Sequence, residues 1–246
     1  MTPAAVLRGL HRRGAPLVLP NVWDCRSARL VQAAGFPAVA TSSAAIADSL
    51  GHRDGQDTPV GDVLDAIARI VDAVSVPVTA DLERGYGLAP AELVQRLEAT
   101  GAVGCNLEDS DPRTGTLLDA EEQAEFLSGV RAAAEADGID VVINARIDTA
   151  LADPAASPAE TLRRARLYRD AGADCVYPIL LRDREVITDL IASAGVPVNL
   201  LAETALSVPE LARLGAARVS FGPHVYRRST GYLAEVVDEI ATASIC

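Results

Sequence analysis

Short apolar runs alternate with longer amphipathic segments along the whole chain. Eight runs rich in β-branched and other apolar residues predict strands at 17–20, 38–41, 76–81, 104–108, 141–146, 175–179, 196–201 and 218–221. The segments between them carry apolar residues at helical spacing and predict helices at 26–34, 60–73, 90–100, 120–136, 158–171, 183–194, 208–214 and 230–242.

Eight strand–helix units in succession predict an α/β fold of one particular kind, a (β/α)₈ barrel that forms a single domain over residues 1–246. A doubly wound parallel sheet is the alternative. That fold usually has fewer strands and a glycine-rich first turn, whereas no G-x-G-x-x-G motif follows the first predicted strand here.

Composition and charge narrow the classes of partner. Apolar residues make up 49% of the 246 residues, which is enough for a large core. A net charge of −12 argues against nucleic acid or an anionic membrane as the main partner. We also expect a cytoplasmic protein without a membrane span, because the sequence shows neither an apolar leader nor ~18 uninterrupted apolar residues. The four cysteines, including Cys246, are far apart, so no disulfide scaffold or zinc ribbon is expected.

The chain contains no lysine, and all 22 basic residues are arginine. This excludes mechanisms that need a lysine amine, such as Schiff-base aldolases, pyridoxal phosphate enzymes and the Walker P-loop. An enzyme of this composition that acts on a carbonyl compound must withdraw electrons with a metal ion or with fixed hydrogen bonds.

Acidic side chains gather where two neighbouring strands of the predicted barrel end. Asp81 and Glu83 close the third strand and Glu108 closes the fourth, while Asp54 lies in the loop after the second. The carboxyl ends of barrel strands form the active site, and converging carboxylates repel one another unless a cation lies between them. Oxygen ligands without nearby His or Cys favour Mg²⁺, with Mn²⁺ as an alternative, over Zn²⁺.

Other polar residues at the strand ends allow two interpretations. Ser42 and Ser43 either cap a turn or hold a carboxylate with their amides and hydroxyls. Asp109 and Asp148 are interpreted as structural, since acids after strands often cap the next helix. Arg146 is a fixed cation that faces the same mouth, where it can pair with a substrate carboxylate or offset enolate charge.

Several motifs in this order resemble one enzyme superfamily. They are "PNVWDCRSARLVQAAGFPAVATSS", "TADLERGYG", "GCNLEDS", "INARIDT", "YRDAGADCVYP" and "ARVSFG", and they run from about Asn21 to Phe221. Together they resemble the isocitrate lyase/phosphoenolpyruvate mutase superfamily. The resemblance implies a barrel enzyme, usually tetrameric with its last helix exchanged between subunits. It also implies that the enzyme binds Mg²⁺ and a small 2-oxo or 2-hydroxy acid and works through an enolate-like pyruvyl intermediate.

The resemblance assigns roles around the implied metal. Asp81 in "DLERGYG" matches the direct ligand, and Glu83 matches the next acidic position. Glu108 in "NLEDS" matches a contact made through water, and Asp54 in "GHRDG" completes the shell. Together with Arg146, the residues Glu108 and Asp54 are the expected catalytic groups.

The resemblance also assigns a substrate site. Ser42 and Ser43 match positions that hold the substrate carboxylate, and Arg146 in "NARID" matches a substrate-binding arginine. His224 in "FGPHVYR" is a looser match. Tyr86 and His224 complete the expected substrate-binding set, and either water or one of these two residues protonates the enolate.

The loop at 110–118 departs from the family pattern. It lacks the cysteine and histidine of the lyase "KKCGH" element, and it has Arg113 and Gly115 where the mutases carry Lys and Asn. The leading hypothesis is therefore a Mg²⁺-dependent carbon–carbon lyase or decarboxylase that acts on a small 2-oxo acid, such as an oxaloacetate-like compound. A phosphonopyruvate hydrolase, a phosphoenolpyruvate mutase-like enzyme and a non-catalytic 2-oxo acid-binding protein are the alternatives. The loop remains a candidate lid.

The last predicted helix, 230–242, has apolar residues at helical spacing: Leu233, Val236, Val237 and Ile240. On the pattern alone this face covers its own barrel. The family resemblance instead implies exchange with a neighbour and hence a homo-oligomer, either a dimer or a tetramer.

Overall fold

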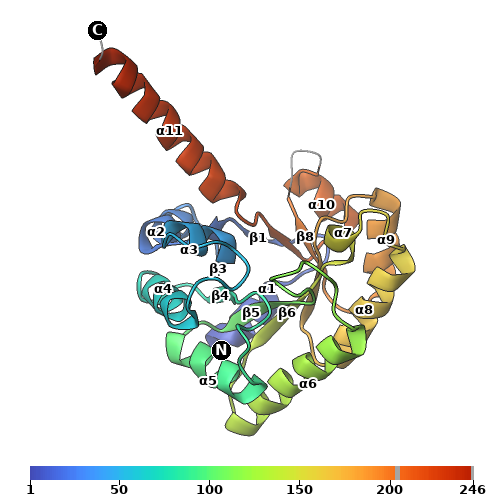
Figure 1. Ribbon diagram of the computed structural model, residues 1–246. Helices are drawn as coiled ribbons and strands as arrows, with labels where there is room; N and C mark the ends of the chain where they lie inside the picture. The colour runs from blue at the N-terminus through green and yellow to red at the C-terminus, as the bar shows by residue number, and fades with distance from the viewer. Residues whose placement is uncertain (203–205, 245–246) are drawn as a thin grey trace.

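Parallel strands form the centre of the molecule in the computed structural model, which describes residues 1–202 and 206–244 (Figure 1). Cys246 lies outside these residues. The strands are β1 (Leu17–Leu19), β2 (Asn21–Val22), β3 (Val39–Thr41), β4 (Val78–Asp81), β5 (Gly104–Glu108), β6 (Val142–Ile147), β7 (Cys175–Pro178), β8 (Asn199–Leu201) and β9 (Arg218–Ser220). They pair in the orders β1-β9-β8 and β2-β3-β4-β5-β6-β7, and every ladder is parallel.

These two sets of strands close into one barrel. The first predicted strand is divided into β1 and β2 at Pro20, which has no N–H to contribute to a ladder. On the other side, a parallel bridge between Val176 and Val198 joins β7 to the segment leading into β8. Since β1 also pairs with β9, the ring is complete. The predicted (β/α)₈ barrel is confirmed, and the open doubly wound sheet is wrong.

The helices surround this ring (Figure 1). They are α1 (Pro3–Leu10), α2 (Cys25–Ala33), α3 (Ser43–Ser49), α4 (Val60–Asp72), α5 (Pro90–Thr100), α6 (Ala120–Asp137), α7 (Thr149–Ala152), α8 (Pro158–Asp170), α9 (Arg184–Ser193), α10 (Val208–Leu214) and α11 (His224–Ser244). The sequence pattern missed α1, α3 and α7. Leu7 of α1 packs with inward-facing side chains of β1, β3 and β6, so α1 covers the amino-terminal end of the barrel. None of the described helices is long and apolar enough to cross a membrane.

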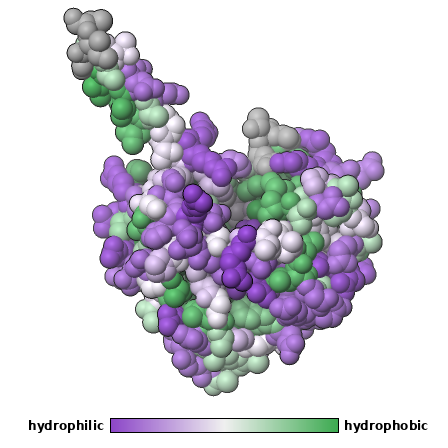
Figure 2. All heavy atoms as spheres, in the orientation of Figure 1, coloured by the Kyte–Doolittle hydropathy of each residue, from purple (hydrophilic) through white to green (hydrophobic). Residues whose placement is uncertain are grey.

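The last helix, α11, extends away from the barrel (Figure 1). It begins at His224, six residues before the predicted start. Its first turn is held against the barrel by Tyr226, whose ring lies edge-on to that of Trp23 at a centroid distance of 5.0 Å. Beyond this turn the apolar side chains are exposed, with Leu233 and Ile240 each 60% accessible. The prediction that this helix covers its own barrel is therefore wrong. Figure 2 shows the apolar side of the helix in green.

Candidate active site

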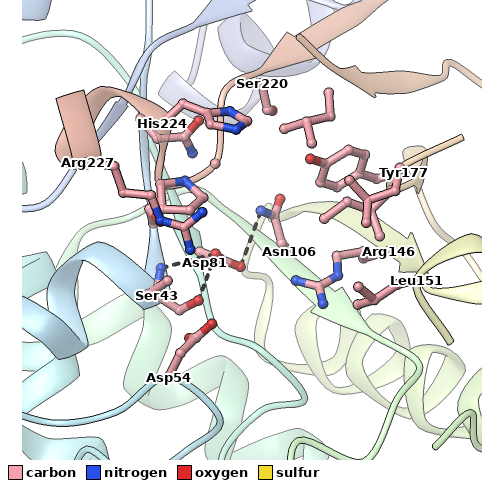
Figure 3. A pocket seen from close by; sticks show the side chains of 18 residues that line it. Ser43, Asp54, Asp81, Asn106, Arg146, Leu151, Tyr177, Ser220, His224 and Arg227 are labelled. Atoms are coloured by element: carbon pink, nitrogen blue, oxygen red, sulfur yellow. Dashed lines mark hydrogen bonds between the residues drawn. The ribbon is translucent and has the colours of Figure 1, made fainter. Parts of the chain in front are cut away.

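A cavity of about 330 Å³ opens at the carboxyl ends of the strands, where the barrel architecture places active sites (Figure 3). Two thirds of the residues predicted for the site line it: Ser42, Ser43, Asp54, Asp81, Arg146 and His224. Five polar residues that the sequence analysis did not select line it too: Asn21, Asn106, Tyr177, Ser220 and Arg227. The carboxyl ends of the strands thus bring together side chains that are far apart in the sequence.

Asp81, the last residue of β4, faces the start of α3. Its Oδ2 accepts hydrogen bonds from the backbone N–H of Ser43, at 3.1 Å, and from the Ser43 hydroxyl, at 3.0 Å. Its Oδ1 accepts a longer bond, 3.4 Å, from the Asn106 amide of β5. The register of the sheet explains this contact, since Asp81 and Asn106 are direct neighbours. In this structure Asp81 therefore occupies the Ser43 donors that the sequence analysis expected for a substrate carboxylate.

Glu83 and Tyr86 do not line the cavity. The Tyr86 hydroxyl donates a 2.7 Å hydrogen bond to Glu83 Oε1, and Glu83 is only 3% exposed. Burial, with the nearby negative charges of Asp54 and Asp81 adding to it, raises the pKa of Glu83 to about 7. Both Glu83 and Tyr86 have a positive φ, 48° and 55°, so the turn that holds them is backbone that non-glycine residues rarely adopt.

Arg146 lines the cavity but already carries two acidic partners. Its Nη1 lies 2.5 Å from the Glu108 carboxylate, and its Nε and Nη2 donate to the two oxygens of Asp148 at 2.6 and 3.0 Å. Although burial opposes it, the charges of Asp148 and Glu108 raise the pKa of Arg146 further above its usual value. A guanidinium has five N–H donors, so these contacts leave two for a substrate. Glu108 does not line the cavity.

Asp109 and Asp148 belong to a buried network and do not cap a helix as the sequence suggested, since Asp148 precedes α7 without a side-chain cap bond. Asp148 is fully buried and also accepts from the Ser110 hydroxyl. Its backbone N–H donates to Asp109, which in turn binds Arg164 of α8. This buried network holds Arg146 in a fixed position at the cavity wall.

The three carboxylates expected to share a metal do not form a common group. Within residues 1–202 and 206–244, no three Asp, Glu, His or Cys side chains come together as a metal-binding cluster. Glu83 is bonded to Tyr86, and Glu108 is paired with Arg146. Asp54 and Asp81, however, both line the cavity, and burial together with the charge of Asp81 raises the pKa of Asp54. Mg²⁺ commonly takes one or two carboxylates and keeps its waters, so this pair fits the ion although the predicted trio does not.

A buried arginine beneath the cavity orients Asn106. Arg218 of β9 is fully buried, and its Nη2 donates to Asn106 Oδ1 at 3.1 Å. The Asn144 amide donates to the same oxygen at 2.8 Å. With Oδ1 occupied by two donors, the Asn106 amide nitrogen points to Asp81. The sequence analysis did not select Arg218, because it is the first residue of its strand and the polar groups were sought at the carboxyl ends of the strands.

The 110–118 loop forms a tight hairpin beside the cavity. Ser110 and Leu117 form an antiparallel bridge, and the Pro112 carbonyl lies 2.9 Å from the point where a side chain on Gly55 would begin. A larger residue at Gly55 would push these two loops apart. Arg113, aligned with the mutase lysine, is 86% exposed in its side chain and does not line the cavity.

The fold and this geometry define a class: a parallel α/β barrel with a polar cavity at the carboxyl ends of its strands, where carboxylates and arginines converge. Such a cavity suits a small anion held with a divalent cation.

The family of this barrel is shown by comparison. The family model described as phosphoenolpyruvate phosphomutase matches residues 7–241. The chain therefore belongs to the phosphoenolpyruvate mutase family, within the isocitrate lyase/phosphoenolpyruvate mutase superfamily of lyases and mutases.

Individual relatives are similar over nearly the whole barrel. Phosphoenolpyruvate phosphomutase of Streptomyces hygroscopicus is 30% identical over 247 residues, which cover 95% of this chain and 78% of that protein. A Burkholderia cenocepacia J2315 crystal structure, provisionally described as a phosphonomutase, is 41% identical with a TM-score of 0.90 and covers 96% of this chain and 98% of its own.

Two further solved structures carry more specific descriptions. A 2,3-dimethylmalate lyase is 26% identical with a TM-score of 0.87 and covers 98% of this chain and 87% of its own. A phosphonopyruvate hydrolase in complex with oxalate and Mg²⁺ is also 26% identical with a TM-score of 0.87, covering 99% of this chain and 88% of its own.

Proposed function

We propose that this protein is a Mg²⁺-dependent carbon–carbon lyase or decarboxylase acting on a small 2-oxo acid through a pyruvate-enolate-like intermediate. The observation that carries the proposal is the pair of carboxylates, Asp54 and Asp81, facing Arg146 across one cavity. Bound there, Mg²⁺ would act as a Lewis acid that stabilises negative charge on the 2-oxo oxygen. Asp81 would hold the ion directly and Asp54 through water. Mn²⁺ is the alternative ion.

Ser43 and Asp81 would exchange partners when substrate binds. Asp81 now accepts both Ser43 donors, so it must turn away from them to bind a cation. That turn releases the Ser43 N–H and hydroxyl for the substrate carboxylate, with Ser42 beside them on the cavity wall. Carboxylate binding should consequently depend on Mg²⁺, because without the ion the two donors stay occupied.

Arg146 and His224 would serve the cleavage step. The remaining N–H groups of Arg146 would stabilise the enolate oxygen, since Glu108 and Asp148 fix the guanidinium in advance of the reaction. Loss of CO₂ requires no proton to be taken from a hydroxyl, which suits a chain without the lyase cysteine. The enolate carbon then needs a proton. His224 lines the cavity whereas the Tyr86 hydroxyl is bonded to Glu83, so His224 is the preferred donor.

Substitution of Asp81 tests the proposal. Asp81→Asn keeps the shape of the side chain but removes its charge. It should weaken Mg²⁺ binding by about 100-fold or more, because the loss of a residue that only orients a metal ligand already costs about 10- to 100-fold. Titration calorimetry with Mg²⁺ and a panel of 2-oxo acids, with products identified by mass, provides the two measurements. Asp65→Asn, an exposed carboxylate on α4, is the matched control. Unchanged Mg²⁺ binding and turnover in Asp81→Asn would remove the assignment.

Phosphonate chemistry is the second candidate, because two of the relatives above are named for a phosphomutase and a phosphonopyruvate hydrolase. The exposed position of Arg113 outside the cavity weighs against it. Conversion of phosphonopyruvate by the wild-type protein, lost in Arg113→Ala, would favour this candidate. A non-catalytic 2-oxo acid-binding protein would instead bind the acids with Mg²⁺ and leave every one of them intact.

We further propose a homo-oligomer, a dimer or tetramer, in which α11 packs on a second copy. The exposed apolar side chains on this helix are Tyr232, Leu233, Val237 and Ile240. Such a contiguous apolar face is typical of an interaction surface. Sedimentation velocity of the wild type would show a monomer if this proposal is wrong.

A further inference from the structure

Tyr177 of β7 lies beside Arg146 at the cavity wall. The two residues are direct neighbours in the β6–β7 ladder, and side chains of register partners point to the same face of a sheet. Both residues line the cavity. In Figure 3 the Tyr177 hydroxyl and the Arg146 guanidinium extend into the cavity from the same side, opposite Ser43 and Asp81.

The Tyr177 hydroxyl has no partner in the part of the chain that the structure describes. The hydroxyls of Tyr86, Tyr168 and Tyr226, in contrast, each donate a hydrogen bond to a carboxylate. The Tyr177 side chain is nevertheless largely buried, since the residue is only 4% exposed. A buried phenol usually finds a hydrogen-bond acceptor, so an unpartnered one that points into a cavity is available to a ligand.

The surroundings of Tyr177 make its hydroxyl a lasting donor. Burial raises its pKa, and of the nearby charges Arg146 opposes this rise while Asp81 adds to it. The phenol therefore keeps its proton at neutral pH. Leu151 and Ile179 line the same cavity and offer no side-chain acceptor that would compete with a ligand. A hydrogen bond formed beside such apolar groups is stronger than one in water.

A charge that develops next to Arg146 would lie within the reach of this hydroxyl. The phenol ring turns about only two side-chain bonds and is held by packing, so its hydroxyl is in place before a substrate binds. Fixed donors aimed at developing charge are the main source of electrostatic stabilisation in enzymes.

We infer that the Tyr177 hydroxyl donates a hydrogen bond to the oxygen that becomes negative in the enolate, as a second donor beside Arg146. The inference rests on the proposed function for the identity of that oxygen. It makes Tyr177 a catalytic residue that stabilises charge and gives up no proton, so the enolate carbon still receives its proton from His224.

Binding of oxalate and pyruvate tests this inference without turnover. Both anions have a carboxylate, but the neighbouring oxygen is charged in oxalate, as it is in the enolate, and neutral in pyruvate. A lost hydrogen bond lowers affinity about 10- to 100-fold for a charged acceptor and about 2- to 10-fold for a neutral one. In calorimetry with saturating Mg²⁺, Tyr177→Phe should therefore bind oxalate that much more weakly and lose less of its affinity for pyruvate.

Tyr168→Phe is the matched control. It also removes the hydroxyl of a buried tyrosine, but Tyr168 does not line the cavity, so the ratio of the oxalate and pyruvate affinities should not change. The urea midpoint of Tyr177→Phe should equal that of the wild type, because its hydroxyl has no partner to lose among the described residues. A destabilised Tyr177→Phe, an unchanged oxalate-to-pyruvate ratio, or an equal loss of the ratio in Tyr168→Phe overturns the inference.

Kinetics on any 2-oxo acid that the wild type converts provide a second measurement. Loss of one donor to a developing oxyanion typically lowers kcat about 100- to 1,000-fold, and KM should change much less. The pH dependence of kcat should stay the same in Tyr177→Phe, because a group that keeps its proton contributes no ionisation. A rise in KM with kcat unchanged would overturn the inference.

Failure of the proposed function would look different. If the wild type bound neither oxalate nor pyruvate with Mg²⁺ and converted no 2-oxo acid, both the function and the inference would be wrong. If the wild type converted 2-oxo acids and Tyr177→Phe kept the full preference for oxalate, only the role of Tyr177 would be wrong.

Discussion

Arg164 on α8 has two acidic partners in very different surroundings, which makes the effect of burial measurable. Its Nη1 lies 2.8 Å from Asp109 and its Nε 2.8 Å from Glu160. The Asp109 side chain is 0% exposed and that of Glu160 is 35% exposed. Asp109 also accepts from the Tyr168 hydroxyl and the Asp148 N–H, and Glu160 also binds Arg163, so removal of each carboxylate compares a buried network with a partly exposed one.

The expected costs follow from what each substitution leaves behind. Asp109→Ala leaves the buried guanidinium, the Tyr168 hydroxyl and the N–H of Asp148 without their acceptor. Breaking a buried pair costs about 3–5 kcal/mol, a large part of a total stability of about 5–15 kcal/mol. Glu160→Ala should cost about 1 kcal/mol or less, because water replaces the lost contact.

Urea unfolding followed by circular dichroism measures both free energies of unfolding. A parallel thermal scan should place the Asp109→Ala midpoint roughly 6–20 °C below that of the wild type. If that variant does not fold, Tyr168→Phe removes only one donor of the network and should cost about 1 kcal/mol. Equal losses in Asp109→Ala and Glu160→Ala would refute the argument that burial makes this network stabilising.

Three further predictions address other parts of the chain. Burial, with the charge of Arg218 adding to it, lowers the pKa of His11 to about 4. The folded protein therefore disfavours protonated His11, and the free energy of unfolding should be constant above about pH 6.5 with respect to this group and fall by up to about 3 kcal/mol as the pH drops to 4. Urea titrations at several pH values should show a smaller fall in His11→Leu. Arg218→Met should leave the urea midpoint unchanged or raised, because it removes a buried cation. It should nevertheless lower kcat, because Asn106 loses the donor that fixes its orientation. A fall in both the urea midpoint and kcat would indicate a merely structural role for Arg218. Leu233→Glu should shift the sedimentation coefficient toward that of a monomer, whereas a shift of similar size in the control Arg228→Gln would contradict the proposed interface.

The secondary structure was largely predictable because it follows from local periodicity. The predicted helices at 90–100 and 208–214 coincide with α5 and α10, and the strand at 104–108 coincides with β5. The misses have local causes too. α3 and α7 are short helices directly after strand ends. α1 precedes the first strand and so lies outside the alternation of strands and helices from which the elements were predicted. Pro20 divided the first strand because a proline cannot donate to the ladder.

The sequence by itself determined the barrel and the end of it where polar groups gather, since strand period and turn residues act over a few neighbours. It thereby placed Asp54, Asp81 and Arg146 around one cavity. Only the tertiary structure decided which groups are already engaged: Glu108 is paired with Arg146, and Asp81 accepts both Ser43 donors. The physical reason is that charge pairing and burial depend on side chains brought together from distant strands and helices, whose directions no local pattern encodes.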